Sequence, residues 1–178
     1  YIKMFKEIFI ETKRSRNRLL SYNQSKSTPT LFLHGFSGMA NSWEEVIKKI
    51  NLYAVTIDII GHGGSTFKNL NIDYDLDDWC DDFYQILNSL NINKINLCGY
   101  SMGGRIAIAF AARYPEKIKQ LIIESAALGI NGNKAKKQRF KEDLELSKTI
   151  ESDLKEFIQN WERNPLFAKQ KERNEVEF

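Results

Sequence analysis

The sequence contains little cysteine and no long apolar run. Its two cysteines, Cys80 and Cys98, are spaced neither as a CxxC pair nor as metal ligands. This argues against a scaffold held by disulfides or structural zinc and favours a reducing compartment. No apolar run approaches the roughly 20 residues that cross a bilayer. Residues 1–16 alternate apolar and polar side chains instead of forming the apolar block of a signal peptide. We therefore expect no membrane partner.

An excess of charge of one sign is also missing. The 178 residues carry a formal net charge of +3, spread along the chain, which gives no basis for nucleic-acid binding. The length suits one domain with a buried core. With 42% hydrophobic and 28% charged residues, the composition is typical of a globular protein.

Short apolar runs alternate with helical patterns over residues 30–124. The expected strands are 30–33, 53–60, 94–98 and 120–124, and the expected helices are 42–50, 76–90 and 103–114. This alternation predicts an α/β fold with a mostly parallel, doubly wound sheet. A strand pair, 5–12 and 18–22, is expected around a basic turn at 13–17. The chain divides into an α/β core, 1–130, and a charged helical segment, 131–178.

Two helix starts carry capping residues. Ser42 stands three residues before a glutamate, which is the spacing of a capping box, and Asp75 precedes the helix at 76–90. The latter helix opens with a cluster of aspartates: Asp77, Asp78, Asp81 and Asp82. A cation site is one explanation of this cluster. The other explanation is that the helix dipole favours carboxylates in the first turns of a helix. We prefer this explanation and expect no metal.

The stretch GYSMGGR, residues 99–105, follows an apolar strand and precedes a helix. Its G-x-S-x-G pattern is typical of a nucleophile elbow, in which glycines allow a sharp turn around the serine. Ser101 then lies at a helix N-terminus, where backbone N–H groups favour negative charge. The alternative is a serine that only caps the helix.

Three neighbours of Ser101 suit the stabilisation and binding of anions. The backbone N–H of Met102 follows the serine, and that of Phe36 lies in the loop after the preceding parallel strand, so the two predict an oxyanion hole. The Phe36 side chain is free to pack, because only its backbone acts. Arg105 lies one helical turn beyond Ser101. It is either a clamp for a substrate carboxylate or a surface arginine.

Five segments together carry a family resemblance: LFLHGF, DIIGHGGS, GYSMGGR, IIESAALGI and WERNPLF. They resemble the α/β-hydrolase fold and, within it, the family of 2-succinyl-6-hydroxy-2,4-cyclohexadiene-1-carboxylate (SHCHC) synthase. That enzyme of menaquinone and phylloquinone biosynthesis is a lyase that eliminates pyruvate from its precursor, SEPHCHC. The resemblance covers about residues 30–170. Its discriminating parts are the arginine of GYSMGGR, the ESA-x-x-G stretch and the W-x-x-x-PLF segment.

The resemblance implies a helical cap in residues 131–178 and a site without a cofactor. It makes Ser101 the catalytic serine and assigns the oxyanion hole to Phe36 and Met102. The implied contacts to a small anionic carboxylate substrate are Tyr100, Arg105, Arg139 and Trp161. Lysines surround Arg139, and their alternative is a solvated helix face; for Trp161 the alternative is core packing. The expected location is the cytoplasm, or an organelle stroma for the phylloquinone pathway.

The histidine that should activate Ser101 is missing from the expected place. In this fold the order is serine, acid, histidine, yet His34 and His62 both precede Ser101. The strand before His62 lies two places from the serine strand in the family, roughly 10 Å away and beyond hydrogen-bond reach. In the family, the residue at the position of His34 shapes the oxyanion loop. Asp143 and Asp153 lie in charged helical sequence, and we expect them to face solvent.

We interpret the chain as a fragment that ends within the cap, with the acid and the histidine beyond Phe178. Three hypotheses follow: a fragment of a SHCHC synthase, a fragment of another α/β-hydrolase such as an esterase or carbon–carbon bond hydrolase, or a degenerate binding protein. A reading frame that continues beyond Phe178 to a histidine motif excludes the third. In the first two, the strand at 120–124 becomes an uncovered apolar edge.

Overall fold

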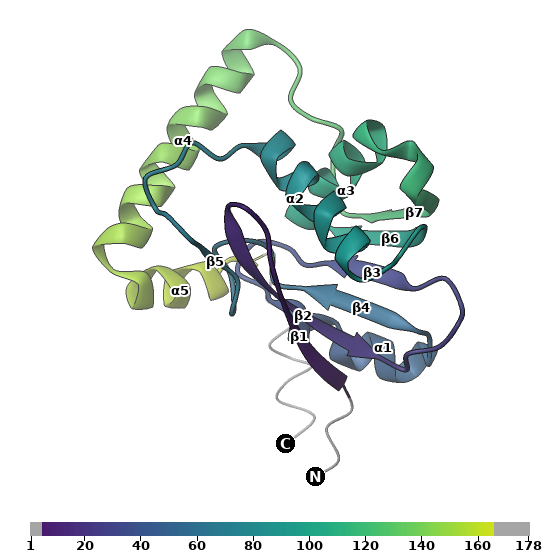
Figure 1. The fold of residues 1–178 in the computed structure, drawn as a ribbon. Coiled ribbons are helices and arrows are strands. Elements are labelled where there is room, and N and C mark those ends of the chain that lie inside the picture. The colour runs from purple at the N-terminus through teal and green to yellow at the C-terminus, as the bar shows by residue number, and fades with distance from the viewer. Residues whose placement is uncertain (1–4, 166–178) are drawn as a thin grey trace. The chain divides into compact units, whose positions relative to one another are not determined.

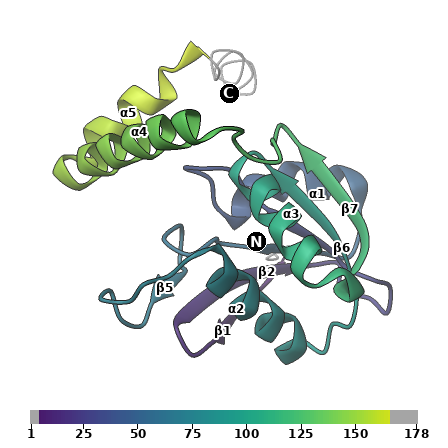
Figure 2. The ribbon, with the colours of Figure 1, turned by 90° about the horizontal axis from the view of Figure 1, so that it is seen from above.

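A computed structural model describes residues 5–165, apart from the side chain of Glu162. The chain forms two compact units, Tyr1–Gly129 and Ile130–Phe178, which are treated separately below. The first unit holds a sheet with helices on both faces, and the described part of the second unit is helical (Figures 1 and 2).

The sheet of the first unit has the order β1-β2-β4-β3-β6-β7, and a short strand, β5, also pairs with β2. The three pairings among β4, β3, β6 and β7 are parallel, whereas β1, β2 and β5 pair in antiparallel fashion. The strands are β1 (Phe5–Glu11), β2 (Ser15–Tyr22), β3 (Thr30–Leu33), β4 (Ala54–Ile57), β5 (Thr66–Phe67), β6 (Ile95–Tyr100) and β7 (Ile118–Glu124). This architecture confirms the expected α/β fold.

Alternation along the central strands divides the core between the two faces. Leu31 and Leu33 of β3 pack with α2 (Leu76–Ser89) and α3 (Met102–Arg113) in the larger cluster. Phe32, between them, belongs to a second cluster with Ile47 of α1 (Glu44–Ile50). Successive strand side chains point to opposite faces, so the four apolar residues of β3 require cover on both sides. The helices on opposite sides of the sheet in Figures 1 and 2 supply it.

Two strands, β2 and β4, differ most from the sequence predictions at their ends, while β6 ends and β7 begins two residues away from the predicted bounds. β2 begins at Ser15, so most of the expected turn at 13–17 is wrong: Thr12 and Ser15 close a tighter turn, and Ser15 is buried against Asp82. β4 ends at Ile57 instead of residue 60. The N–H of Ile59 donates to the ring of His34, and this diverts the chain out of the ladder.

The start of α1 also differs from its prediction. A 3-10 helix, η1 (Ala40–Trp43), precedes it, and Ser42 Oγ accepts the N–H of Met39 (3.1 Å) instead of capping α1. The buried carboxylate of Asp58 holds the N–H of Ala40 (2.6 Å), so the chain begins to turn earlier than the pattern indicates. By contrast, Asp75 caps α2 as expected, through the N–H of Asp78.

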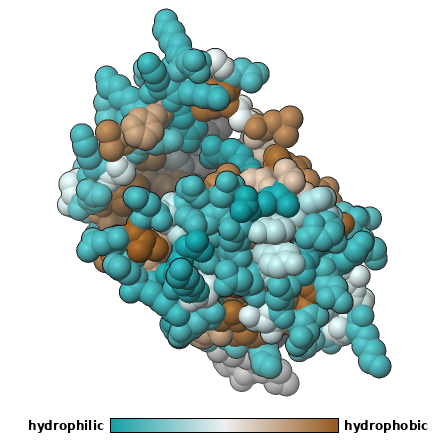
Figure 3. All heavy atoms as spheres, turned by 45° about the horizontal axis from the view of Figure 1, so that its top comes forward, coloured by the Kyte–Doolittle hydropathy of each residue, from teal (hydrophilic) through white to brown (hydrophobic). Residues whose placement is uncertain are grey.

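The second unit contains α4 (Asn133–Ser152) and α5 (Leu154–Glu162), which confirms one or two charged helices without strands in its described part. α4 has no buried residue, whereas Phe157 of α5 is 6% exposed. The remaining short element is the 3-10 helix η2 (Pro115–Lys117) of the first unit. On the face drawn in Figure 3, hydrophobic residues form separate patches within a mostly hydrophilic surface. Within residues 5–165, no helix is both long and apolar enough to span a membrane.

Candidate active site

Ser101 occupies a strained turn between β6 and α3. Its φ of 52° and ψ of −111° place it in a backbone region that residues other than glycine rarely adopt. The turn is held at both sides of the serine: its N–H donates to the carbonyl of Glu124 on β7 (2.9 Å), and its carbonyl accepts the N–H of Arg105 (3.1 Å). Such strain persists where surrounding structure fixes it, and it is common at active sites.

Two glycines around the serine let α3 approach the sheet closely. A Cβ at Gly103 would lie 2.4 Å from the carbonyl oxygen of Leu33 on β3. A Cβ at Gly99 would lie 2.5 Å from the carbonyl oxygen of Gly103. Both contacted oxygens belong to the backbone, so they cannot rotate away as the end of a side chain could. Gly103 is therefore required by the packing of α3 against β3, and Gly99 by the close approach of β6 to the start of α3, as the motif predicts.

The expected oxyanion donors flank this turn. Met102 is the first residue of α3, so its N–H has no acceptor one turn earlier in the helix. The carbonyl of Gly35 accepts hydrogen bonds from the N–H of Gly38 (3.1 Å) and from Nδ1 of His34 (2.8 Å). In a trans peptide the N–H points away from the carbonyl. These two bonds therefore set the direction of the N–H of Phe36, which belongs to the same peptide group.

His34 is a fixed part of this loop. Its side chain is buried, and Nε2 accepts the N–H of Ile59 (2.9 Å), so the neutral ring carries its hydrogen on Nδ1. Burial lowers the pKa of His34, which keeps the ring neutral. Both ring nitrogens are thus engaged, and His34 is unsuited to accept a proton from Ser101.

His62 packs beside the same loop. Its ring centroid lies 5.0 Å from that of His34, and it meets the ring of Phe36 edge-on at 6.0 Å. The strand before it, β4, is separated from β6 by β3, as the family order implies. Among the residues that the structure describes, neither histidine hydrogen-bonds to Ser101.

Asp58 is a structural residue that the sequence prediction missed. Its fully buried carboxylate accepts the N–H groups of Ala40 (2.6 Å) and Gly64 (2.7 Å) and pairs with Arg18 (3.0 Å). It thereby joins the loop after β3 to the loop after β4. The available signal is an aspartate directly after a buried strand in DIIGHGG, but its charge partner lies 40 residues earlier.

Two expected substrate contacts lie in the first unit. The half-buried Tyr100 ends β6, and its ring passes so close to Gly35 that a Cβ there would lie 2.9 Å from it. Arg105 is exposed on the first turn of α3, and no carboxylate within the described part of the chain pairs with it. Its guanidinium is available to an anion near Ser101.

The other two expected contacts belong to the second unit. Arg139 pairs with Asp143 one turn along α4 (2.7 Å). Trp161 is half-buried and stacks on Phe157 at 5.7 Å, which fits the core-packing alternative. Asp153 caps α5 through the N–H of Glu156. The roles of Arg139 and Trp161 toward a substrate stay predictions.

The aspartates of α2 form ion pairs with two arginines. Arg14 pairs with Asp78 (2.6 Å) and Asp82 (3.2 Å). Arg113 pairs with Asp81 (2.7 Å) and, more loosely, with Asp77 (3.7 Å). No group of three or more histidine, cysteine or acidic residues suited to a metal occurs in residues 5–165. These carboxylates hold α2 against the hairpin of β1 and β2 and against α3.

Curated relatives are similar to this chain in sequence over most of its length. A Bacillus subtilis protein provisionally assigned as a SHCHC synthase is 34% identical over 148 residues, which are 81% of this chain and 53% of that protein. The Klebsiella pneumoniae SHCHC synthase is 32% identical over 143 residues, 78% of this chain and 54% of that enzyme. The chain thus spans about half the length of these two relatives. The chloroplastic protein PHYLLO of Arabidopsis thaliana is 28% identical over 77% of this chain and 8% of its own length.

Solved structures agree with this fold. Staphylococcus aureus MenH superposes with a TM-score of 0.76 at 29% identity, over 86% of this chain and 59% of that one. Naproxen esterase of Bacillus subtilis superposes with a TM-score of 0.64 at 25% identity, over 69% and 44% of the two chains. A family model described as the alpha/beta hydrolase fold matches residues 28–170. The chain therefore belongs to the α/β-hydrolase family.

Proposed function

We propose that the complete protein is a SHCHC synthase of menaquinone or phylloquinone biosynthesis, a lyase that eliminates pyruvate from SEPHCHC. The observation that carries this proposal is the strained turn at Ser101, with Arg105 one helical turn away and unpaired with any carboxylate of residues 5–165. The identities of 32–34% to proteins with this name support the same assignment. The location we propose is the cytoplasm or, given a chloroplastic relative, an organelle stroma.

In the proposed reaction Ser101 acts as the base. Its deprotonated oxygen removes a proton from carbon, and the electron pair left behind forms a carbon–carbon double bond as the carbon–oxygen bond to the leaving group breaks. The leaving group departs as the enolate of pyruvate, which takes up a proton to become pyruvate. Negative charge that develops on an enolate-like oxygen is stabilised by the N–H groups of Met102 and Phe36. Because this charge develops only on the way to the transition state, fixed donors that stabilise it lower the barrier and raise the rate.

The arginines and aromatic residues serve to bind the substrate. Arg105 is proposed to hold a substrate carboxylate by two parallel hydrogen bonds, for which the guanidinium is suited. Tyr100 lines the same end of β6. Arg139 and Trp161 are proposed to contribute from the cap, where Arg139 exchanges its bond to Asp143 for the substrate carboxylate. This chemistry requires no metal or organic cofactor.

Activation of Ser101 requires a base, and neither histidine within residues 5–165 hydrogen-bonds to this serine. His34 is excluded because both of its ring nitrogens already hold backbone groups. We place the acid and the histidine after the cap, where the family order puts them.

The test uses the complete protein, with SEPHCHC and simple aryl esters as competing substrates. The expected result is stoichiometric pyruvate release that the Ser101→Ala variant loses, by about 10³-fold or more, with little ester cleavage. Rapid ester cleavage without pyruvate release would overturn the lyase assignment and favour an esterase, to which the likeness with naproxen esterase points. Activity in neither assay would favour a binding protein.

A further inference from the structure

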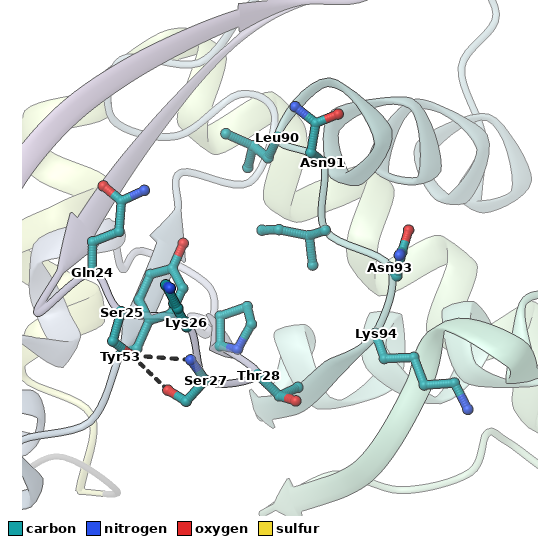
Figure 4. Close-up of a pocket in the computed structure, with 12 residues that line it drawn as sticks. Gln24, Ser25, Lys26, Ser27, Thr28, Tyr53, Leu90, Asn91, Asn93 and Lys94 are labelled. Atoms are coloured by element: carbon teal, nitrogen blue, oxygen red, sulfur yellow. Dashed lines mark hydrogen bonds between the residues drawn. The ribbon is translucent and has the colours of Figure 1, made fainter.

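A polar hollow lies at the end of the sheet opposite to Ser101. Its volume is about 390 Å³, within the range of small-molecule sites. It is formed by the segment before β3, the residue before β4 and the segment between α2 and β6 (Figure 4). It is lined by residues 24–29, Tyr53 and residues 90–94. We refer to it as the amino-end pocket, because β3 and β6 begin there and Ser101 follows the other end of β6.

The charges of the amino-end pocket are of one sign. Lys26 and Lys94 line it, whereas no aspartate or glutamate does. Neither lysine pairs with a carboxylate anywhere in the described part of the chain. Other basic residues of the first unit do form such pairs, among them Arg14, Arg18, Lys68 and Arg113. Hydroxyl and amide groups provide the other polar lining. An anion in the pocket therefore meets donors and no competing carboxylate.

The backbone around the pocket is held in place. Ser27 bonds to Ser25 through both its N–H (3.3 Å) and its hydroxyl (2.7 Å). Asn91 adopts a left-handed conformation with φ of 55°, and its N–H donates to Asn88 (2.9 Å). Pro29 is tied to β6 through the N–H of Asn96 (3.0 Å). Preformed walls lower the entropy that a ligand must overcome on binding.

The floor of the pocket is partly apolar. The ring of Tyr53 lies among the polar residues in Figure 4, with Pro29, Leu90 and Ile92 also contributing. Tyrosine offers a flat apolar face together with a hydroxyl at its tip. A ligand with both a charged group and an apolar body would thus be recognised better than a bare ion.

We propose that the amino-end pocket binds a small organic anion, with its phosphate or carboxylate group at Lys26 and its apolar body against Tyr53. Lys94, whose ammonium points away from Tyr53 in Figure 4, adds positive charge at the rim. The site is separate from the candidate active site and goes beyond the proposed function. Charge-assisted hydrogen bonds to the ammonium group of Lys26 supply much of the affinity. Binding should therefore weaken as ionic strength rises.

The experiment is an amide NMR titration of the complete protein with phenyl phosphate and, separately, benzoate. It is performed in an Arg105→Ala background, so that the probe does not bind at the candidate active site. Saturable shifts are expected at the amides of Ser27, Asn91 and Lys94. Inorganic phosphate should bind more weakly, and benzyl alcohol should give no saturable shift at these amides.

Variants decide whether the lysines are responsible. The double variant Lys26→Ala/Lys94→Ala should bind phenyl phosphate roughly tenfold more weakly. The matched control is Lys49→Ala/Lys119→Ala, which removes two exposed lysines of the same unit outside the pocket and should leave the affinity unchanged. Equal losses in both double variants would show nonspecific attraction and overturn the proposal. So would shifts confined to residues near Ser101, or the same affinity for benzyl alcohol as for phenyl phosphate.

Discussion

The ring of His34 and the backbone N–H of Ile59 form a hydrogen bond of 2.9 Å that joins the loops after two neighbouring strands, β3 and β4. The same ring donates to the carbonyl of Gly35 and so orients the peptide that carries the N–H of Phe36. His34, which precedes the serine in the sequence, is thus a structural clamp. Its position explains why a histidine before the nucleophile does not complete the site.

Loss of this clamp should appear in the pH dependence of stability. Burial lowers the pKa of His34 below its ordinary 6.5, so between the two pKa values the unfolded chain binds more protons than the folded chain. The contribution of neutral His34 to the free energy of unfolding is fully present above about pH 6.5, and it falls as the pH drops toward the pKa of His34 in the folded chain. In urea unfolding from pH 8 to 5, His34→Gln should lose much of this slope. His62→Gln serves as the control, and equal loss of slope in both variants would contradict the assignment to His34.

The strain at Ser101 predicts opposite effects on stability and activity. Glycine adopts a φ of 52° without the steric cost that serine bears. Ser101→Gly should therefore stabilise the fold by about 1 kcal/mol relative to Ser101→Ala, because only the former relieves the turn. Both variants should lack pyruvate release. Thermal unfolding of the two variants measures the difference, and equal stability would mean that the turn stores no strain.

A matched pair of glycines separates steric overlap from backbone strain. Gly103→Ala places a methyl group 2.4 Å from the carbonyl oxygen of Leu33, whereas Gly61→Ala, at φ of 82°, has no atom within 4 Å. We expect a loss of about 3 kcal/mol or more for the first and about 1 kcal/mol for the second. Chemical denaturation measures both. A larger loss for Gly61→Ala would contradict the close packing of α3 on β3.

The sequence predicts the parts of the fold that local chemistry decides. Alternating apolar runs predict β3, β6 and β7, and Asp75 marks the start of α2 because a cap needs only its own neighbours. The serine turn is equally local, since the motif and the glycines that it needs lie within a few residues. The differences occur where distant residues decide: β4 ends early because His34, in the loop after β3, accepts the N–H of Ile59.

Long-range pairing also explains what the sequence does not reveal at the site. The role of Asp58 depends on Arg18, and the acidic start of α2 is neutralised by Arg14 and Arg113, all of them far away in the chain. No spacing rule connects such partners. Similarly, a pattern within one helix carries no information on whether Arg139 contacts a substrate.

Arg105 should affect substrate binding through its geometry as well as its charge. Lysine retains the charge but presents a single ammonium instead of a planar fork, so Arg105→Lys should lower kcat/KM for pyruvate release by about 30-fold. The loss should appear mainly in KM if the arginine holds a carboxylate throughout the reaction. Arg113→Lys is the control, because Arg113 pairs with Asp81 at the far end of α3. Unchanged kinetics for Arg105→Lys would remove this residue from the proposed site.

The edge strand β7 predicts association of a polypeptide limited to residues 1–178. Within the described residues β7 pairs only with β6, and Leu121 and Ile122 are 40% and 48% exposed. An open edge with apolar side chains is a template for pairing with another chain, and lysine on an edge strand opposes such pairing. Ile122→Lys should therefore shift this polypeptide toward the monomer in size-exclusion chromatography with light scattering.

The control for this prediction is Leu70→Lys. Leu70 is 85% exposed in the segment between β5 and α2, so the substitution adds the same charge and removes a similar apolar group away from the edge. If Leu70→Lys restores the monomer equally well, general charge repulsion rather than edge pairing controls association. If residues 1–178 are monomeric and catalytically competent without any substitution, neither β7 nor a histidine beyond residue 178 has the role given to it here.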